Sequence, residues 1–364
     1  MKILIKKQAI IKFKRLIYLA SVFLPLVLVP FLIISLGIEY WDELFLKEEK
    51  SPEVFTFNVP QNKLTIEPIL ETERDSNFIY SEEILPENFF PLASPDPDRI
   101  YYEVKEIDAS REAGSEGISI NDSTNSSTDI KALLNEEYNP DFGDYTLYSD
   151  EPLVLIYHTH TSESFENSFR GFYYEDDYFR TENLEENVCA VGEAMKKILE
   201  ENGIKAIHDT TFHDTPMFNG AYSRSKETVL SYLEKYPSIK ITIDLHRDAM
   251  VTDEGLSYKP TIKINGKKAA QMMIIAGCDP DNELGYENWL ENLPFSLHIQ
   301  KTAESLYPNL MRPLMFARRS YNMGLTDTSF LLEVGTQSNT LSEAVYSGKL
   351  MGNILSEVIL KYLE

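Results

Sequence analysis

The sequence predicts an α/β protein in which helices cover both faces of a mostly parallel, twisted β-sheet. From about residue 118 to the end of the chain, apolar runs of strand length alternate with amphipathic segments of helical length. Alternating strands and helices are typical of sheets whose parallel strands are joined by helical crossovers. A long apolar run near the N-terminus and an acidic stretch after it predict that a transmembrane helix and a spacer precede this domain.

Residues 16–38 are uncharged and rich in Leu, Ile, Val and Phe. A run of this length can cross the bilayer core, which needs roughly 20 residues. Basic residues gather in residues 1–15 and the first acidic residue is Glu39, so we expect a cytoplasmic N-terminal tail and an extracytoplasmic remainder. A cleaved signal peptide is the alternative. Its apolar region would be about 7–15 residues long with a small-x-small site after it, whereas this run is longer and lacks such a site, so we favour an uncleaved single-pass anchor in the cell membrane.

The stretch 39–117 is predicted to be an extended acidic spacer. It is rich in Glu, Asp, Pro and Ser and shows little apolar periodicity, and such a composition buries too little apolar surface to offset the entropy of ordering. At most, short elements such as one at 99–104 are expected. The formal net charge of −24 over the 364 residues argues against nucleic acid as a partner, because phosphate binding needs clustered Lys and Arg.

Apolar periodicity places the elements of the domain at 118–364. Short apolar runs bounded by polar residues predict strands at 118–120, 153–157, 204–207, 239–245, 314–316 and 330–334. Apolar residues at helical spacing, ended by Gly203 or before a proline, predict helices at 184–202, 222–236, 289–306 and 341–363. One β-hairpin is expected over 261–277, with its turn at Asn265-Gly266.

The strongest chemical signal directly follows the strand at 153–157, in the run Tyr157-His-Thr-His-Thr-Ser-Glu-Ser164. His160 and Glu163 form a His-x-x-Glu pattern at the end of a strand. Imidazole nitrogens and carboxylate oxygens are good zinc ligands, and a catalytic zinc site uses three protein ligands and leaves one position for water. The pattern therefore predicts two ligands of a zinc site, and the third must come from a distant segment.

The strand at 239–245 leads into the run Asp244-Leu-His-Arg-Asp248, which offers that third ligand. Because side chains alternate along a strand, Asp244, His246 and Asp248 face the side opposite to the apolar residues between them. We predict that His246 is a zinc ligand and that Asp244 accepts the second N–H of its ring. The alternative is a core histidine that is hydrogen-bonded to its neighbour.

The strand at 330–334 is apolar except for Glu333. A glutamate in such a setting is costly unless it is paired or functional, and open α/β sheets bind ligands beyond the carboxyl ends of their strands. Glu333 is therefore predicted to be a general base that takes a proton from water. A glutamate salt-bridged at the edge of the sheet is the alternative.

Other candidate groups are expected to be structural. Cys189 and Cys278 are the only cysteines; we expect buried free thiols, with a disulfide as the alternative, and neither lies at a spacing typical of metal sites. The aromatic and acidic stretch at 169–179 could stack on sugars, although packing on the domain is favoured. The basic residues Arg312, Arg318 and Arg319 are expected at a solvated edge rather than against substrate.

Three of these segments together resemble the stage II sporulation protein P family. They are residues 157–165, 244–248 and 332–335, and residues 339–344 fit the same pattern. The family is membrane-anchored and related to zinc-dependent N-acetylmuramoyl-L-alanine amidases. The resemblance covers about residues 118–364 and includes the single anchor. It implies an amidase-like fold, Zn²⁺ as cofactor and peptidoglycan as substrate, cleaved between the muramic acid lactyl group and the stem peptide.

The resemblance also implies cross-link endopeptidase activity and partners in the septal complex that remodels the wall during sporulation. Carried over by motif, His160 and His246 are zinc ligands and Glu333 is the catalytic carboxylate. Related amidases take the third ligand near the start of the helix after the first histidine, where this chain offers Glu182, Glu185 and Glu186. We prefer Glu163, because it belongs to the motif itself.

Two further residues are assigned to the surroundings of the site. His158 is expected to line the pocket rather than to bind the metal. Arg247 could turn toward the cleft and bind a stem-peptide carboxylate through two hydrogen bonds, or it could pair with Asp248 or Asp244.

Two other functions are compatible with the same residues. A zinc carboxypeptidase-like peptidase would use a similar His-x-x-Glu, distant His and later Glu, and it would release terminal amino acids instead of freeing the lactyl carboxylate. A catalytically inactive scaffold that binds the wall would hold no zinc.

Overall fold

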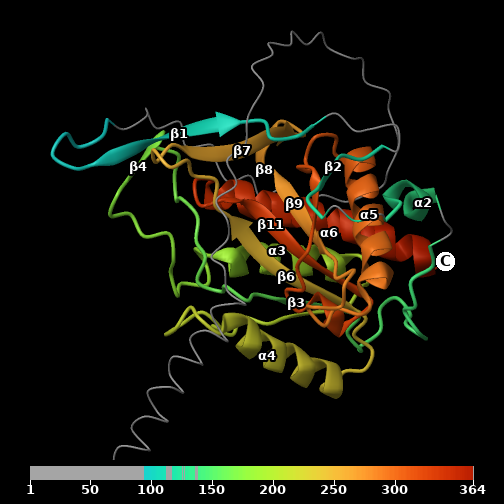
Figure 1. Ribbon diagram of the computed structural model, residues 1–364. Helices are drawn as coiled ribbons and strands as arrows, with labels where there is room; N and C mark the ends of the chain where they lie inside the picture. Colours follow the sequence, from blue (N-terminus) through green and yellow to red (C-terminus); the bar gives the residue numbers. More distant parts are fainter. Residues whose placement is uncertain (1–93, 112–116, 125, 127, 136–137, 364) are drawn as a thin grey trace, which may run out of the picture. The chain divides into compact units, whose positions relative to one another are not determined.

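The computed structural model describes residues 94–111, 117–124, 126, 128–135 and 138–363 (Figure 1). These residues form a mixed α/β fold with two β-sheets. The predicted tail at 1–15, the predicted anchor at 16–38 and most of the predicted spacer lie outside the described residues. Among the helices that the structure does describe, none is both long and apolar enough to span a membrane.

The larger sheet contains the strands that carry the three sequence motifs. Its members are β2 (Ile120–Asp122), β3 (Val154–Tyr157), β5 (Ala206–His208), β6 (Ile241–Asp248), β9 (Met272–Gly277), β10 (Leu314–Ala317) and β11 (Thr328–Thr336). Their order across the sheet is β2-β10-β9-β11-β6-β3-β5. Every neighbouring pair is parallel except β9 and β11. The mostly parallel sheet predicted from the sequence is therefore present.

Helices pack on both faces of this sheet. The elements are α2 (Ile130–Asn135), α3 (Val188–Glu201), α4 (Ala221–Lys235), α5 (Trp289–Leu306), α6 (Leu341–Leu363) and a 3₁₀ turn, η1 (Met323–Leu325). Buried side chains of α3, α5 and α6 share the main core with one face of the sheet. On the other face, Val229 of α4 packs with Leu155 and Tyr157 of β3. The predicted helix at 184–202 begins later, because Asn187 caps α3 by accepting a hydrogen bond from the backbone N–H of Cys189.

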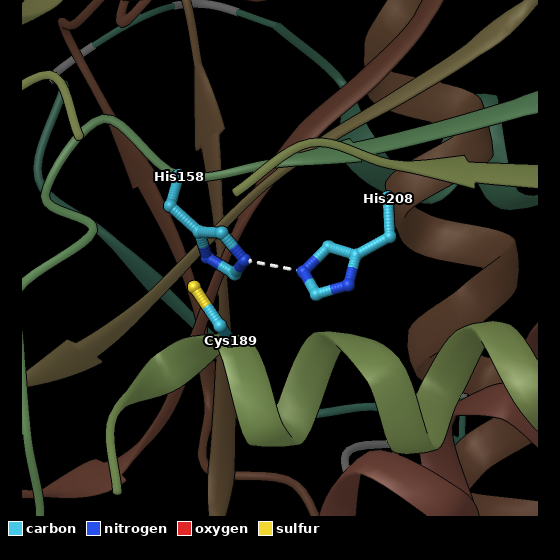
Figure 2. A group of neighbouring side chains, drawn as sticks. All are labelled: His158, Cys189 and His208. Carbon is cyan, nitrogen blue, oxygen red and sulfur yellow. Dashed lines mark hydrogen bonds between the residues drawn. The ribbon is translucent and has the colours of Figure 1, made fainter. Parts of the chain in front are cut away.

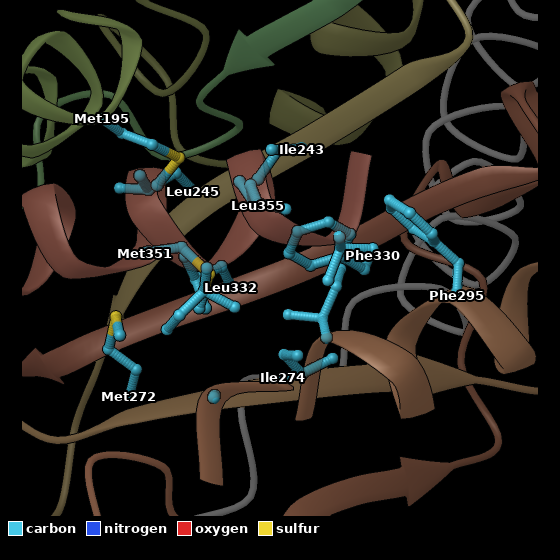
Figure 3. Packing of buried hydrophobic residues seen from close by; sticks show 14 of the residues in the cluster. Met195, Ile243, Leu245, Met272, Ile274, Phe295, Phe330, Leu332, Met351 and Leu355 are labelled. Carbon is cyan, nitrogen blue, oxygen red and sulfur yellow. The ribbon is translucent and has the colours of Figure 1, made fainter. Parts of the chain in front are cut away.

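Alternation along the central strands decides which residues remain for chemistry. Ile243 and Leu245 of β6 and Leu332 of β11 belong to the main core, together with Met351 of α6 (Figure 3). Fully burying one such side chain contributes roughly 1.5–3 kcal/mol, so the register of these strands is strongly specified. The intervening residues, including His246, consequently lie on the opposite face.

The smaller sheet includes a strand from the region predicted to be spacer. Its order is β4 (Phe172–Tyr174), β1 (Tyr101–Ile107), β7 (Ser257–Ile264) and β8 (Lys267–Ala270). In β1, Val104 is buried, and Glu106 forms ion pairs with Lys259 at 3.3 Å and Lys268 at 2.8 Å. The folded region thus begins before residue 118, because β1 obtains from β4 and β7 the partners that its own composition does not reveal.

The predicted hairpin at 261–277 is confirmed only in its first half. β7 and β8 pair antiparallel, and Asn265 and Gly266 adopt the positive φ angles that this turn requires. The second arm is wrong as a single strand, because the chain leaves the small sheet at Gln271 and continues as β9 in the large one. The buried amide of Gln271 stabilises this crossing by donating to the Asp108 carboxylate and the Asn309 carbonyl.

Candidate metal centre

The three motif strands lie side by side in the order β11-β6-β3. In their parallel register Glu333 is opposite His246, and Tyr157 is opposite Asp244. His160 and Glu163 follow in the turn after β3. Parallel strands end at the same edge of a sheet, so residues far apart in the sequence gather at one place.

His160, Glu163 and His246 form a group that can hold a metal ion. One ligand atom from each lies within 4.8 Å of the other two. Nδ1 of His160 is 3.6 Å from Glu163 Oε1, and Nδ1 of His246 is 3.4 Å from Glu163 Oε2. These distances exceed those of ordinary hydrogen bonds, yet they are close to the ~3.3 Å that separates two ligands of one tetrahedral zinc ion. The donor set fits Zn²⁺.

Glu163 is ionised in this setting. Burial would raise the pKa of its carboxyl group, but the adjacent imidazoles of His160 and His246 and the charge of Arg247 hold that pKa well below its usual range. The backbone N–H of Arg247 also donates to Glu163 Oε2 at 3.1 Å. A deprotonated carboxylate is the form that binds metal ions.

Asp244 contacts the side of His246 that faces away from Glu163. Its Oδ1 lies 2.9 Å from His246 Nε2, and its two oxygens accept hydrogen bonds from the backbone N–H and the hydroxyl of Thr159 at 2.8 and 2.7 Å. Burial raises the pKa of Asp244, but His246 and Thr159 together lower it below the ordinary value. Asp244 thus lies within reach of Nε2, although the ring is not aligned for a hydrogen bond, and Nδ1 faces Glu163 and the metal position.

Glu333 lies beside this group, and one oxygen of its carboxylate has no hydrogen-bond partner. Its Oε2 is buried and accepts no hydrogen bond. Burial, together with the nearby carboxylate of Asp248, raises the pKa of Glu333 to about 8. Asp248 itself pairs with Arg312 at 2.7 Å. An unpaired carboxylate with a raised pKa is suited to accept and return a proton.

The structure corrects the expected position of His158. Its ring is fully buried on the opposite face of the sheet, on the side of α3, and does not line the pocket. Nδ1 of His158 lies 2.8 Å from the carbonyl oxygen of Leu245, and Nε2 lies 2.8 Å from Nε2 of His208. The reason is that His158 continues the inward-facing side of β3, whereas His160 lies in the turn beyond it.

Arg247 does not form the alternative ion pair with Asp244 or Asp248, and its expected contact with a stem-peptide carboxylate stays a prediction. Its guanidinium donates to the backbone carbonyls of Ser164 at 3.1 Å and Phe179 at 2.9 Å, and more weakly to that of Asp248 at 3.4 Å. The side chain therefore connects the turn after β3 to the aromatic stretch at 169–179. Its contribution to the site is to hold the segment that carries Glu163.

The alternative third ligands are placed elsewhere. Glu182 and Glu185 are exposed and Glu186 is half-buried, and the His–Glu–His group contains Glu163 instead. The turn after β3 explains this preference, because it brings Glu163 back between the two imidazoles within three residues of His160.

Several residues near the centre were not predicted from the sequence. The ring of Phe218 stacks on His160 with 4.4 Å between centroids, and Tyr222 contacts His160 and His246 at 5.7 and 6.5 Å. Arg180 covers Phe218 and lies 3.6 Å from Glu163 Oε1. The sequence indicated only that Tyr222 lies in a helix. Phe218 lies in a loop, and no sequence pattern pointed to a position near the site.

The remaining candidate segments have structural roles. The aromatic stretch at 169–179 includes β4, where Phe172 and Tyr174 are buried, as the favoured interpretation predicts. Arg318 pairs with Asp281 and Glu283 at the surface. Arg312 differs from its expectation, because it is 3% exposed and pairs with Asp248 beside the centre.

Fold and site together define a mixed α/β protein with a candidate metal centre at the carboxyl edge of its parallel strands. The sequence profile of the family described as stage II sporulation protein P matches residues 71–356, and the chain belongs to this family. The stage II sporulation protein P of Bacillus subtilis (strain 168) is 28% identical over 221 residues, which are 57% of this chain and 51% of that protein. The chain thus matches about half the length of this curated relative.

Solved amidase structures were also matched. The N-acetylmuramoyl-L-alanine amidase AmiC2 of Nostoc punctiforme is 15% identical with a TM-score of 0.32, and the match covers 59% of this chain and 98% of that one. The CwlD amidase from Clostridioides difficile, solved in complex with the GerS lipoprotein, is 11% identical with a TM-score of 0.35 and coverage of 58% and 98%.

Proposed function

We propose that this protein is a zinc-dependent peptidoglycan hydrolase that cleaves the lactyl-amide bond between muramic acid and the stem peptide. The observation that carries the proposal is the group of His160, Glu163 and His246, with Glu333 directly opposite His246 on the next strand. Membership of a sporulation protein family supports a role in septal wall remodelling. Endopeptidase cutting of cross-links is a further activity of the same centre that we propose to test.

We propose further that residues 16–38 anchor the protein in the cell membrane. The charge distribution around this run supports a cytoplasmic N-terminus and an extracytoplasmic catalytic domain. The wall would then be the substrate, and septal proteins of the sporulating cell would be the partners.

In the proposed reaction His160, Glu163 and His246 hold the metal. Zinc, when bound, supplies a Lewis acid that polarises the amide carbonyl and lowers the pKa of water toward about 7. Asp244 would keep the ring of His246 oriented through its contact with Nε2. Glu333 Oε2 accepts one proton from the attacking water, whose oxygen bonds to the carbonyl carbon, and passes it to the nitrogen of the leaving amine. The C–N bond then breaks, and an amine and a carboxylic acid, which ionises in solvent, are released.

Digestion of isolated peptidoglycan by the purified full-length chain tests this proposal. Mass spectrometry of the products should show glycan with free lactyl carboxylates and intact stem peptides. His160→Ala and His246→Ala should abolish the release of stem peptides, whereas the exposed Glu185→Gln variant should retain it. Full activity of the His246 variant would contradict the site.

The same experiment separates the two alternatives. Release of terminal amino acids without free lactyl groups would indicate a carboxypeptidase-like enzyme. A purified chain that holds no zinc and digests nothing, yet sediments with peptidoglycan, would indicate an inactive scaffold.

A further inference from the structure

A second group of metal-ligand side chains lies on the opposite face of the large sheet (Figure 2). It consists of His158 directly after β3, Cys189 in the first turn of α3, and His208 at the end of β5. One ligand atom from each residue lies within 4.8 Å of the other two. None of the three takes part in the proposed hydrolysis.

Hydrogen bonds orient the two imidazole rings so that their Nε2 lone pairs face each other. Nδ1 of His158 contacts the carbonyl oxygen of Leu245 at 2.8 Å, and because a carbonyl only accepts, this nitrogen carries the proton. Nδ1 of His208 contacts the carboxylate of Glu193 at 3.1 Å and is protonated for the same reason. The two Nε2 atoms are 2.8 Å apart. Two facing lone pairs repel unless a proton or a metal ion lies between them.

Two observations favour a metal ion over a shared proton. The sulfur of Cys189, which is 2% exposed, lies in the same group, and a shared proton would need no third donor. In addition, a carbonyl and a carboxylate at the far nitrogens of both rings are the usual partners of metal-bound imidazoles. Zinc at about 2.0–2.1 Å from each nitrogen would place the nitrogens ~3.3 Å apart, so the rings need to separate by only about 0.5 Å.

The backbone around the group is shaped to bring the three donors together. Gly192 of α3 lies under His208, and a Cβ at this position would be 2.5 Å from His208 Nε2. Glycine in mid-helix therefore allows the ring to lie against α3. The side chain of Asn187 accepts a hydrogen bond from the N–H of Cys189 at 2.9 Å, which fixes the first turn of the helix and with it the position of the thiol.

We propose that His158, Cys189 and His208 bind a second zinc ion, which joins the ends of β3 and β5 to α3. A thiolate with two imidazoles is a donor set that suits zinc. The burial of His158 and Cys189 excludes substrate from this site, so the role of the ion is structural. His158 is two residues before His160, and the ion would thereby fix the segment that enters the candidate metal centre. This inference stands independently of the proposed function.

Cobalt substitution of the full-length chain tests the proposal. Protein that has been stripped with a chelator is reloaded with Co²⁺, which shows thiolate-to-metal charge-transfer absorption only when sulfur is a ligand. His160, Glu163 and His246 provide no sulfur, so the absorption reports on the second group alone. We expect it in the wild type and in Cys278→Ser, and its loss in Cys189→Ser. Its absence from the wild type, or its persistence in Cys189→Ser, would overturn the proposal.

A second variant keeps the test valid if Cys189→Ser folds poorly. Glu193→Gln retains all three donors and alters only the carboxylate that orients His208. It should weaken Co²⁺ affinity at the sulfur-containing site by roughly 10–100-fold, measured by titration of the same absorption. Unchanged affinity would contradict the ligand role of His208. Glu163→Ala should keep the absorption, and its loss there would show that the two groups do not bind metal separately.

Discussion

The two histidine groups differ in what surrounds them, although one strand end supplies a histidine to each. His160 is 15% exposed and lies against Phe218, which is itself 40% exposed. His158 is 0% exposed and Cys189, in the first turn of α3, is 2% exposed. A substrate can reach only the first group. The difference teaches that access, rather than donor type, distinguishes the roles proposed for the two groups, because β3 directs His158 inward and its turn directs His160 outward.

The largest expected effect is a loss of hydrolysis without a loss of stability, from a substitution at Glu333. Glu333→Gln removes the proposed proton acceptor, and hydrolysis of peptidoglycan should fall roughly 10²–10⁴-fold. The midpoint of thermal unfolding should not fall, because the substitution removes a buried carboxylate whose Oε2 has no partner. Rates of stem-peptide release and calorimetry check both. A variant that hydrolyses at the wild-type rate would show that Glu333 is not the base.

A smaller loss is expected from the residue that orients His246. Asp244→Asn weakens the acceptor that contacts His246 Nε2 and Thr159, so zinc affinity and activity should each fall by roughly 10–100-fold. Competition with a chromophoric chelator measures the affinity. The exposed Glu185→Gln variant serves as the control. If Asp244→Asn lowered activity without changing zinc affinity, Asp244 would act on the reaction rather than through the ligand.

The second group is tested by adding a single methyl group. Alanine in place of a mid-helix glycine normally stabilises a helix by about 1 kcal/mol, but Gly192→Ala places Cβ against His208. Overpacking typically costs 1–3 kcal/mol, so we expect a net loss of up to about 2 kcal/mol in the free energy of unfolding by urea. The double variant Gly192→Ala/His208→Ala should remove the clash. If the free-energy losses of the two single variants simply added in the double variant, the strain would not arise from contact between Gly192→Ala and His208.

The smallest effect is expected at Glu106 in the smaller sheet, which belongs to neither histidine group. Burial would raise the pKa of Glu106, but Lys268 and Lys259 lower it below the model-compound value of 4.5. A depressed pKa stabilises the folded state above pH 4.5, and that contribution is lost as the pH falls through the lower folded value. Glu106→Gln should therefore destabilise the protein by about 0.2–1 kcal/mol at pH 7 and by less at pH 3.5. Urea unfolding at both pH values measures it, and equal losses would exclude an ionic origin.

Local patterns predicted the parts of the molecule that depend on one strand at a time. Alternation in β6 placed Asp244 and His246 on one face, and the apolar run before Glu333 marked β11. The positions of Glu163 and Asp244 then followed from strand ends that meet at one edge. The cofactor and the roles of these residues remain predictions, because zinc binding and amide cleavage have to be measured.

Pairing between strands that are distant in the sequence could not be predicted from local patterns. β1 overlaps the short element expected at 99–104, but nothing in its sequence indicated that it would pair with β4 and β7. The group of His158, Cys189 and His208 comes from three elements, with no spacing that would associate the cysteine with the histidines. Such sites are created by topology, so their residues carry no local signal.

The pairing of β1 with β7 also sets how far the catalytic domain can extend from the bilayer. With the proposed anchor ending at residue 38, residues 39–100 separate it from β1, in place of the 39–117 expected from the sequence. Fully extended chain spans at most about 3.3–3.6 Å per residue, so this connection shortens to roughly four-fifths of its expected maximum. Under the proposed anchoring and activity, hydrolysis would be restricted to a thinner layer of wall next to the membrane.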